Sequence, residues 1–172
     1  MSAPMNAQRG QALEDLLIWQ HSIYQGNRKA TIWNNGLKAE VKSSRRRGDD
    51  ITGHNNIVLV KSRPDFEGVL TCMQGRHVAF DAKVVSTMRY RHENRRMHQL
   101  ADLYDVHIAG GIAFLLVAVN LEDFFIVWPH SVWGRAKFSV DLGLCQRVPI
   151  NGNYRLPDWL SIVQEPGREV RS

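Results

Sequence analysis

Ile112–Val119 is an unbroken run of eight apolar residues that directly follows two glycines. A run of this length, bounded by turn residues, predicts a strand that is buried along its whole length. Apolar residues recur at helical spacing in two earlier segments, Ala7–Tyr24 and Asn94–Val106. Other segments predict strands at Lys29–Trp33, Ile57–Val60, Phe66–Cys72, Arg76–Lys83 and Asp123–Trp128, and short helices at Pro129–Lys137 and Asp158–Val163. This order predicts the α/β class, with a central mixed β-sheet flanked by helices.

The length of 172 residues predicts one domain over residues 1–172. The apolar run is shorter than the ~20 residues that cross a bilayer, and the first residues lack the apolar centre of a signal peptide. Cys72 and Cys145 have no Cys or His nearby at the spacing of a zinc site, which favours two reduced thiols. We therefore expect a soluble intracellular protein with no membrane partner.

A polar and basic segment at residues 34–56 interrupts the predicted elements and includes Arg45, Arg46 and Arg47. Such a segment buries little surface, so it is either a mobile loop or a projection from the core. Residues 165–172 form a polar tail. Lys and Arg number 22 against 17 Asp and Glu, and the net charge of +5 suits a polyanion such as nucleic acid without requiring one.

Asp65, Asp81 and Lys83 form the constellation most able to carry chemistry. Side chains alternate between the two faces of a strand, so Asp81 and Lys83 share one face while Phe80 lies on the other. If the chain turns at Gln74-Gly75, the hairpin brings Asp65 beside Asp81 and Lys83. Two carboxylates and an ammonium group then meet at one edge of the sheet.

Two interpretations of this convergence are open. A surface salt bridge between Asp81 and Lys83 is a common and weak interaction. Alternatively, the two carboxylates bind a hard divalent cation, Mg2+ or Mn2+, which activates a water and neutralises charge on a phosphate. In that case Lys83 orients the attacking water or helps to deprotonate it.

Pro64-Asp65, followed sixteen positions later by Asp81-Ala82-Lys83, resembles the signature of the PD-(D/E)XK nucleases. Further elements between Arg9 and Trp133 are similar, in order, to those of the RecU-type Holliday junction resolvases: Arg9-Gly10, Leu13-Glu14, Lys61-Ser62, Asp65-Phe66, Gly68-Val69, Phe80-Asp81-Ala82-Lys83, His98-Gln99-Leu100 and Gly110-Gly111-Ile112-Ala113-Phe114. The resemblance implies a restriction-endonuclease-like core with a protruding stalk at about residues 34–56.

The resemblance also implies roles for individual residues. The implied catalytic set, which works with Mg2+ or Mn2+, is Glu14, Asp65, Asp81, Lys83 and Gln99. The implied metal ligands are Asp65, Asp81, the backbone carbonyl of Ala82 and, directly or through water, Glu14. Lys83 would position the attacking water, and Gln99 would support the site from the second helix.

Basic residues are expected to contact the phosphates of a four-way junction: Arg9, Lys38, Lys42, Arg45, Arg46, Arg47, Arg89, Arg91 and Arg95. The arginines of the stalk would enter the centre of the junction, whereas the cluster that begins at Arg89 is either a solvated face or a second DNA contact. A junction with twofold symmetry must be nicked twice, so we expect a homodimer with two sites. The expected location is the cytoplasm of a bacterium or of a phage-infected host cell.

The sequence departs from the resembled family at Asp81, where Glu is usual, and at Val84 and Val85, where a polar continuation is usual. These departures indicate a divergent member, of a kind that a phage could encode. We expect a metal-dependent endonuclease that resolves Holliday junctions or other branched DNA by hydrolysing phosphodiester bonds. Two alternatives stay open: a nuclease of restriction or repair type that cuts duplex DNA, and a non-catalytic DNA-architectural protein.

Overall fold

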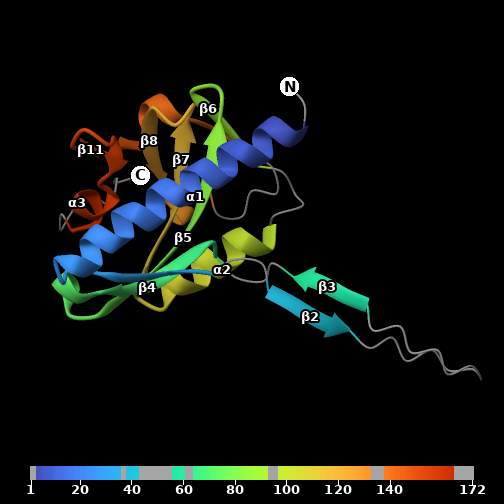
Figure 1. Ribbon diagram of the computed structural model, residues 1–172, viewed down its shortest axis with the longest axis horizontal. Helices are drawn as coiled ribbons and strands as arrows, with labels where there is room; N and C mark the ends of the chain where they lie inside the picture. The colour runs from blue at the N-terminus through green and yellow to red at the C-terminus, as the bar shows by residue number, and fades with distance from the viewer. Residues whose placement is uncertain are drawn as a thin grey trace, which may run out of the picture.

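The computed structural model describes residues 3–35, 38–42, 56–60, 64–92, 97–132 and 138–164. Within them the largest sheet has six strands in the order β1-β4-β5-β7-β8-β10 (Figure 1). These strands span Thr31–Asn34, Phe66–Leu70, Arg76–Val85, Ile112–Val119, Asp123–Val127 and Gln146–Arg147, and the helices are α1 (Ala3–Gly26), α2 (Met97–Ile108) and α3 (Trp159–Val163). Because β5 and β7 pair in parallel while the other neighbours pair antiparallel, the sheet is mixed.

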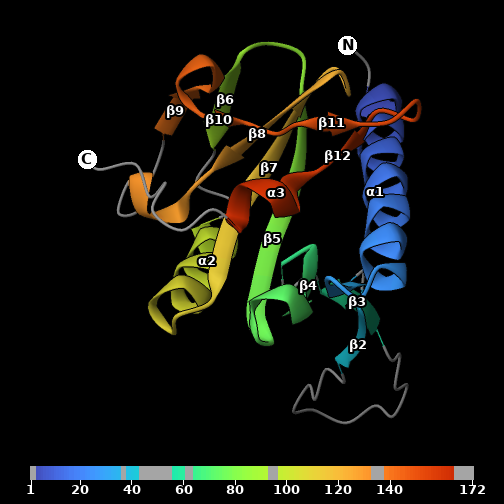
Figure 2. The same ribbon diagram turned by 90° about the vertical axis from the view of Figure 1, so that its left-hand side faces the viewer.

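β7 lies inside the sheet and is buried at every residue, as its apolar run predicts. On one face of the sheet, Phe114 of β7 belongs to a core that includes Leu17 of α1. On the other face, Leu115 belongs to a second core that includes Leu103 of α2. Figure 2 shows the sheet between these two helices. The predicted α/β class, with a central mixed sheet flanked by helices, is therefore confirmed.

Several short elements complete the described part of the fold: η1 (Thr71–Met73), β6 (Arg89–His92), η3 (Pro129–Ser131), β9 (Phe138–Asp141), η4 (Leu142–Leu144), β11 (Ile150–Asn151) and β12 (Leu156–Pro157). β6 pairs with β9, and β11 with β12, both antiparallel. The helix expected at Pro129–Lys137 is wrong in its described part, because a single 3-10 turn ends at Ser131. Residues 133–137 lie outside the described part.

Helix α3 and the residue before it are held against α1 by polar contacts that are buried or partly buried. The hydroxyl of Tyr24 donates to Oδ1 of Asp158 at 2.7 Å, and Nε1 of Trp159 donates to Nε2 of His21 at 3.3 Å. Trp159 is fully buried in the same core as Phe80. The C-terminal helix therefore closes the face of the sheet that α1 covers. None of the helices in the described part is long and apolar enough to cross a membrane.

Strands β2 (Lys38–Lys42) and β3 (Asn56–Val60) form a separate antiparallel ribbon. Figure 1 shows this ribbon leading away from the body of the molecule. The strand expected at Ile57–Val60 exists, but it pairs with β2 and not with the central sheet, so the ribbon includes residues beyond the expected end of the insertion at residue 56. Residues 43–55 lie outside the described part, as do residues 165–172.

Candidate active site

Asp65 and Asp81 are brought together by the pairing of β4 with β5. Phe66 pairs with Phe80 in this register, so one further step places Asp65 opposite Asp81. The rings of Phe66 and Phe80 stack at 5.1 Å in the core under α1. Because side chains alternate along a strand, the two carboxylates face the other side of the sheet, which α2 covers. The expected convergence of these acids is present in the structure.

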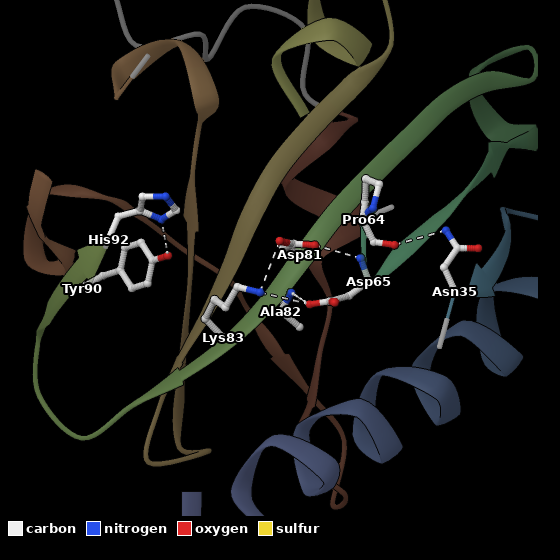
Figure 3. A network of polar contacts seen from close by, with 8 residues as sticks. All are labelled: Asn35, Pro64, Asp65, Asp81, Ala82, Lys83, Tyr90 and His92. Carbon is white, nitrogen blue, oxygen red and sulfur yellow. Dashed lines mark hydrogen bonds and ion pairs between the residues drawn. The ribbon is translucent and has the colours of Figure 1, made fainter. Parts of the chain in front are cut away.

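Two hydrogen bonds link the acids reciprocally to the backbone of the facing strand (Figure 3). The backbone N–H of Asp65 donates to Oδ1 of Asp81 at 2.8 Å, and the backbone N–H of Ala82 donates to Oδ2 of Asp65 at 3.1 Å. Hydrogen bonds to an ionised acceptor are among the stronger ones in proteins. They fix both carboxyl groups in place before any substrate arrives.

The ammonium group of Lys83 bridges the two carboxylates. Its Nζ lies 3.2 Å from Oδ2 of Asp65 and 3.2 Å from Oδ2 of Asp81. The side chains of Lys83, Asp65 and Asp81 are 11%, 5% and 0% exposed. The contact is therefore not the surface salt bridge that the sequence left open, because all three groups are withdrawn from water. Buried charges of this kind require close compensation, and the lysine provides it.

Burial also changes the protonation behaviour of Asp81. Loss of water around its carboxyl raises the pKa of Asp81 above its ordinary value, and the nearby carboxylate of Asp65 acts in the same direction. The ammonium of Lys83 acts in the opposite direction, as does the hydrogen bond from the backbone of Asp65. The net shift is upward, so the ionised form of Asp81 depends on a neighbouring positive charge.

The donor set fits a hard divalent cation. Two carboxylates from neighbouring segments already converge on one positive centre, and oxygen ligands of this kind suit Mg2+ or Mn2+. The described part of the chain holds no group of three or more His, Cys, Asp or Glu side chains placed to bind a metal. Water or other oxygen atoms would therefore supply the remaining ligands, as is common for Mg2+.

Glu14 and Gln99 occupy different positions relative to this centre. Glu14 lies on α1 with its side chain half-buried, and it forms no such metal-binding group with Asp65 and Asp81 among the described residues. Gln99 lies in the first turn of α2, which covers the face that carries the carboxylates, and it is 7% exposed. Its buried Oε1 accepts no hydrogen bond from the described part of the chain. The roles of both residues, and of the carbonyl of Ala82, stay predictions.

The basic residues expected to contact DNA are only partly described. Arg89 and Arg91 are exposed on β6, and Arg9 is half-buried on α1. Lys38 and Lys42 begin and end β2, but their side chains lie outside the described residues. The other four lie wholly outside them: Arg45, Arg46, Arg47 and Arg95.

Asn35 also helps to position Asp65, although no pattern in the sequence indicates this role. Its backbone N–H donates to the carbonyl of Asp65 at 2.9 Å, and its Nδ2 donates to the carbonyl of Pro64 at 3.2 Å. Asn35 therefore anchors the short segment that carries the first carboxylate. The sequence placed it in the polar insertion, and no local spacing connects it with Pro64.

Comparisons with known proteins give a matching family model and a similar solved structure. The family model described as RecU, recombination protein U, matches residues 8–136, which is more than half of the chain. Among solved structures, the chain is similar to Hjc, a Holliday junction resolvase of the archaeal hyperthermophile Archaeoglobus fulgidus, with 11% sequence identity and a TM-score of 0.39. That likeness covers 65% of this chain and 83% of the other. A comparison with curated proteins finds no match.

Proposed function

Because the chain belongs to the RecU family of Holliday junction resolvases, which are endonucleases that act on DNA, we propose that the Asp65–Asp81–Lys83 centre is its metal-dependent active site. The single observation that carries this proposal is the convergence of two buried carboxylates on one cation, with Nζ of Lys83 at 3.2 Å from each. A buried pair of acids is costly unless a positive charge accompanies it. A divalent cation bound by the two carboxylates would compensate their charge and would give the buried pair a catalytic role.

The proposed reaction is in-line hydrolysis of a phosphodiester bond. Asp65 and Asp81 would hold Mg2+ or Mn2+, and the carbonyl of Ala82 and, directly or through water, Glu14 would be further ligands. When bound, such an ion would lower the pKa of a water and neutralise charge on the phosphate. Lys83 donates hydrogen bonds from Nζ and so orients the attacking water beside the carboxylates. The family resemblance implies products with a 5′-phosphate and a 3′-hydroxyl.

Gln99 is proposed to support the reacting groups from α2. Its amide is buried on the carboxylate face of the sheet, and Oε1 accepts no hydrogen bond from other described residues. An unsatisfied buried acceptor is unfavourable, so a partner that arrives with the metal or the substrate would relieve it. A water bound at the site is the kind of donor that this oxygen suits.

Junction recognition is proposed to use the ribbon of β2 and β3 together with separate basic groups. The ribbon leads away from the body of the protein (Figure 1), and the insertion between its strands carries three consecutive arginines. Contacts with phosphates in the open centre of a junction need charge more than fixed geometry. The basic residues proposed to act there and along the arms are Arg9, Lys38, Lys42, Arg45, Arg46, Arg47, Arg89, Arg91 and Arg95.

A homodimer is proposed because the substrate has twofold symmetry. Resolution of a four-way junction requires one cut in each of two opposite strands. Two identical subunits related by a twofold axis place one active site at each of these positions.

The proposal is tested by cutting of a synthetic four-way junction compared with a duplex of the same sequence. With Mg2+, the wild type is expected to nick the junction at least tenfold faster than the duplex. Asp81→Asn is expected to abolish cutting while junction binding persists. Equal rates on both substrates would indicate a duplex nuclease, and unchanged activity of Asp81→Asn would indicate that the acidic centre is not catalytic.

A further inference from the structure

His107 and His130 form a second cluster of metal-binding side chains, away from the carboxylates. His107 lies in the last turn of α2, and His130 lies in η3, which packs against that helix. Their imidazole rings have centroids 5.6 Å apart. His130 is exposed and His107 is half-exposed, so an ion in solution can reach the pair.

The separation of the two rings is close to what a shared metal ion requires. A histidine nitrogen binds a transition metal at about 2.0–2.1 Å, and the ring centre lies about 1.2 Å behind that nitrogen. Two imidazoles at a tetrahedral angle therefore have centroids about 5 Å apart. The observed 5.6 Å exceeds this by an amount that small side-chain rotations can supply.

Aromatic rings lie beside both imidazoles. The rings of His130 and Trp128 have centroids 6.4 Å apart and an interplanar angle of 21°. Nε1 of Trp128 in turn donates a hydrogen bond to Oε1 of Gln146 at 2.9 Å. The ring of His107 lies beside that of Tyr104, one turn earlier on α2, and their centroids are 6.3 Å apart. Neighbours of this kind limit the orientations open to each imidazole, so less conformational freedom is lost when both bind one ion.

We propose that His107 and His130 bind a borderline transition-metal ion, such as Zn2+, Ni2+ or Cu2+, and thereby clamp the end of α2 to η3. Imidazole nitrogen suits these ions, whereas the carboxylates of the active site suit Mg2+ or Mn2+. No group of three or more metal-binding side chains occurs in the described residues, so water completes the coordination sphere. Neither histidine forms a group with Asp65 and Asp81 among the described residues, so the two metal sites are separate.

The test uses untagged protein in excess Mg2+, which occupies the carboxylate site, and measures binding of Ni2+ by calorimetry. One ion is expected for each chain. His107→Gln and His130→Gln are each expected to weaken binding at least about tenfold, because either change leaves one imidazole without its chelating partner. His77→Gln is the matched control, since His77 is exposed on β5 in the same protein and its loss should leave the affinity unchanged.

Cu2+ gives a second readout that reports the ligands directly. Electron paramagnetic resonance of the Cu2+ complex is expected to show nitrogen coupling from two imidazoles in the wild type and from one imidazole in either variant. Equal Ni2+ affinity in the wild type and in the His107→Gln/His130→Gln double variant, with circular dichroism showing both folded, would overturn the proposal. Asp81→Asn should retain the Ni2+ site, and the double variant should still cut junctions, so this inference and the nuclease proposal fail separately.

Discussion

The backbone N–H of Asp65 donates a 2.8 Å hydrogen bond to Oδ1 of Asp81, so the residue that supplies one carboxylate also fixes the other. The two residues face each other because β4 and β5 pair in one register. A slip of one residue would send one of the carboxylates to the opposite face of the sheet. The chemistry of the site therefore depends on how accurately this hairpin is packed.

Gly68→Ala should disturb that packing from the neighbouring strand. A Cβ on Gly68 would lie 2.8 Å from Cα of Ile32 in β1, and it would also collide with the carbonyl oxygen of Thr31. Because both of these atoms belong to backbone, the strands must separate, and we expect the free energy of unfolding to fall by about 2 kcal/mol. Urea unfolding measures this change.

Gly10→Ala is the matched control for Gly68→Ala. Gly10 lies in α1, and no heavy atom lies within 4 Å of an added Cβ. Alanine favours a helix more than glycine by up to about 1 kcal/mol, so this variant should be as stable as the wild type or more stable. If both alanine variants have wild-type stability, the close approach of β1 to β4 is not as described.

Lys83→Met should separate the structural role of the lysine from its catalytic one. Without the ammonium, two buried carboxylates lose their shared counter-charge, and we expect the free energy of unfolding to fall by about 3 kcal/mol in a chelator. Mg2+ should recover part of this loss, while junction cutting should fall at least about a hundredfold. Urea unfolding with and without Mg2+ measures the first effect. Lys29→Met, at an exposed position, should change neither quantity.

Removal of the divalent cation should stop cutting without releasing DNA. We expect a chelator to lower the rate of junction nicking at least about a thousandfold, because the attacking water loses its activation. Junction binding, measured by gel shift, should persist because the basic residues contact phosphates independently. Added Mg2+ or Mn2+ should restore the rate. Undiminished cutting in the chelator would exclude the proposed chemistry.

His21 should make the protein sensitive to acid. Burial lowers the pKa of His21 to about 3, while an unfolded chain has a histidine pKa near 6.5. Below pH 6.5, His21 therefore binds a proton in the unfolded state but stays neutral in the folded state until the pH approaches 3. The contribution of His21 to the free energy of unfolding is fully present above about pH 6.5. It is lost as the pH falls toward 3, at up to about 1.4 kcal/mol per pH unit.

His21→Gln keeps an acceptor for the N–H of Trp159 but does not titrate, so its free energy of unfolding should depend less on pH between 6.5 and 4. His77→Gln changes an exposed histidine and should keep the wild-type pH dependence. Chemical denaturation at a series of pH values provides the comparison. Parallel curves for His21→Gln and the wild type would show that His21 is not the group responsible.

Several features of the fold follow from local patterns in the sequence. The apolar run at Ile112–Val119 and the turn at Gln74-Gly75 predict a buried strand and a hairpin, and both are present. Once the hairpin is placed, the period of two along a strand places Asp65 beside Asp81. These features were predictable because each depends on neighbouring residues and on one short turn.

Other features depend on contacts between distant segments and left no local signal. β11 and β12 have two residues each, too few for any periodicity, and β3 pairs with β2 in place of the central sheet. Asn35 contacts Pro64 across a polar insertion, which no spacing rule connects. The burial of Lys83 between two acids likewise depends on packing. The sequence alone left a surface salt bridge and a metal-binding site as equally open interpretations.

The most direct test of the central claim is Mn2+ binding to the protein without DNA, followed by electron paramagnetic resonance. The wild type should bind one Mn2+ at the carboxylate centre, with Mg2+ competing for it. Asp65→Asn and Asp81→Asn should each weaken this binding at least about tenfold, while Asp105→Asn, at an exposed position on α2, should not. Equal Mn2+ affinity in all four proteins would contradict a metal site at Asp65 and Asp81.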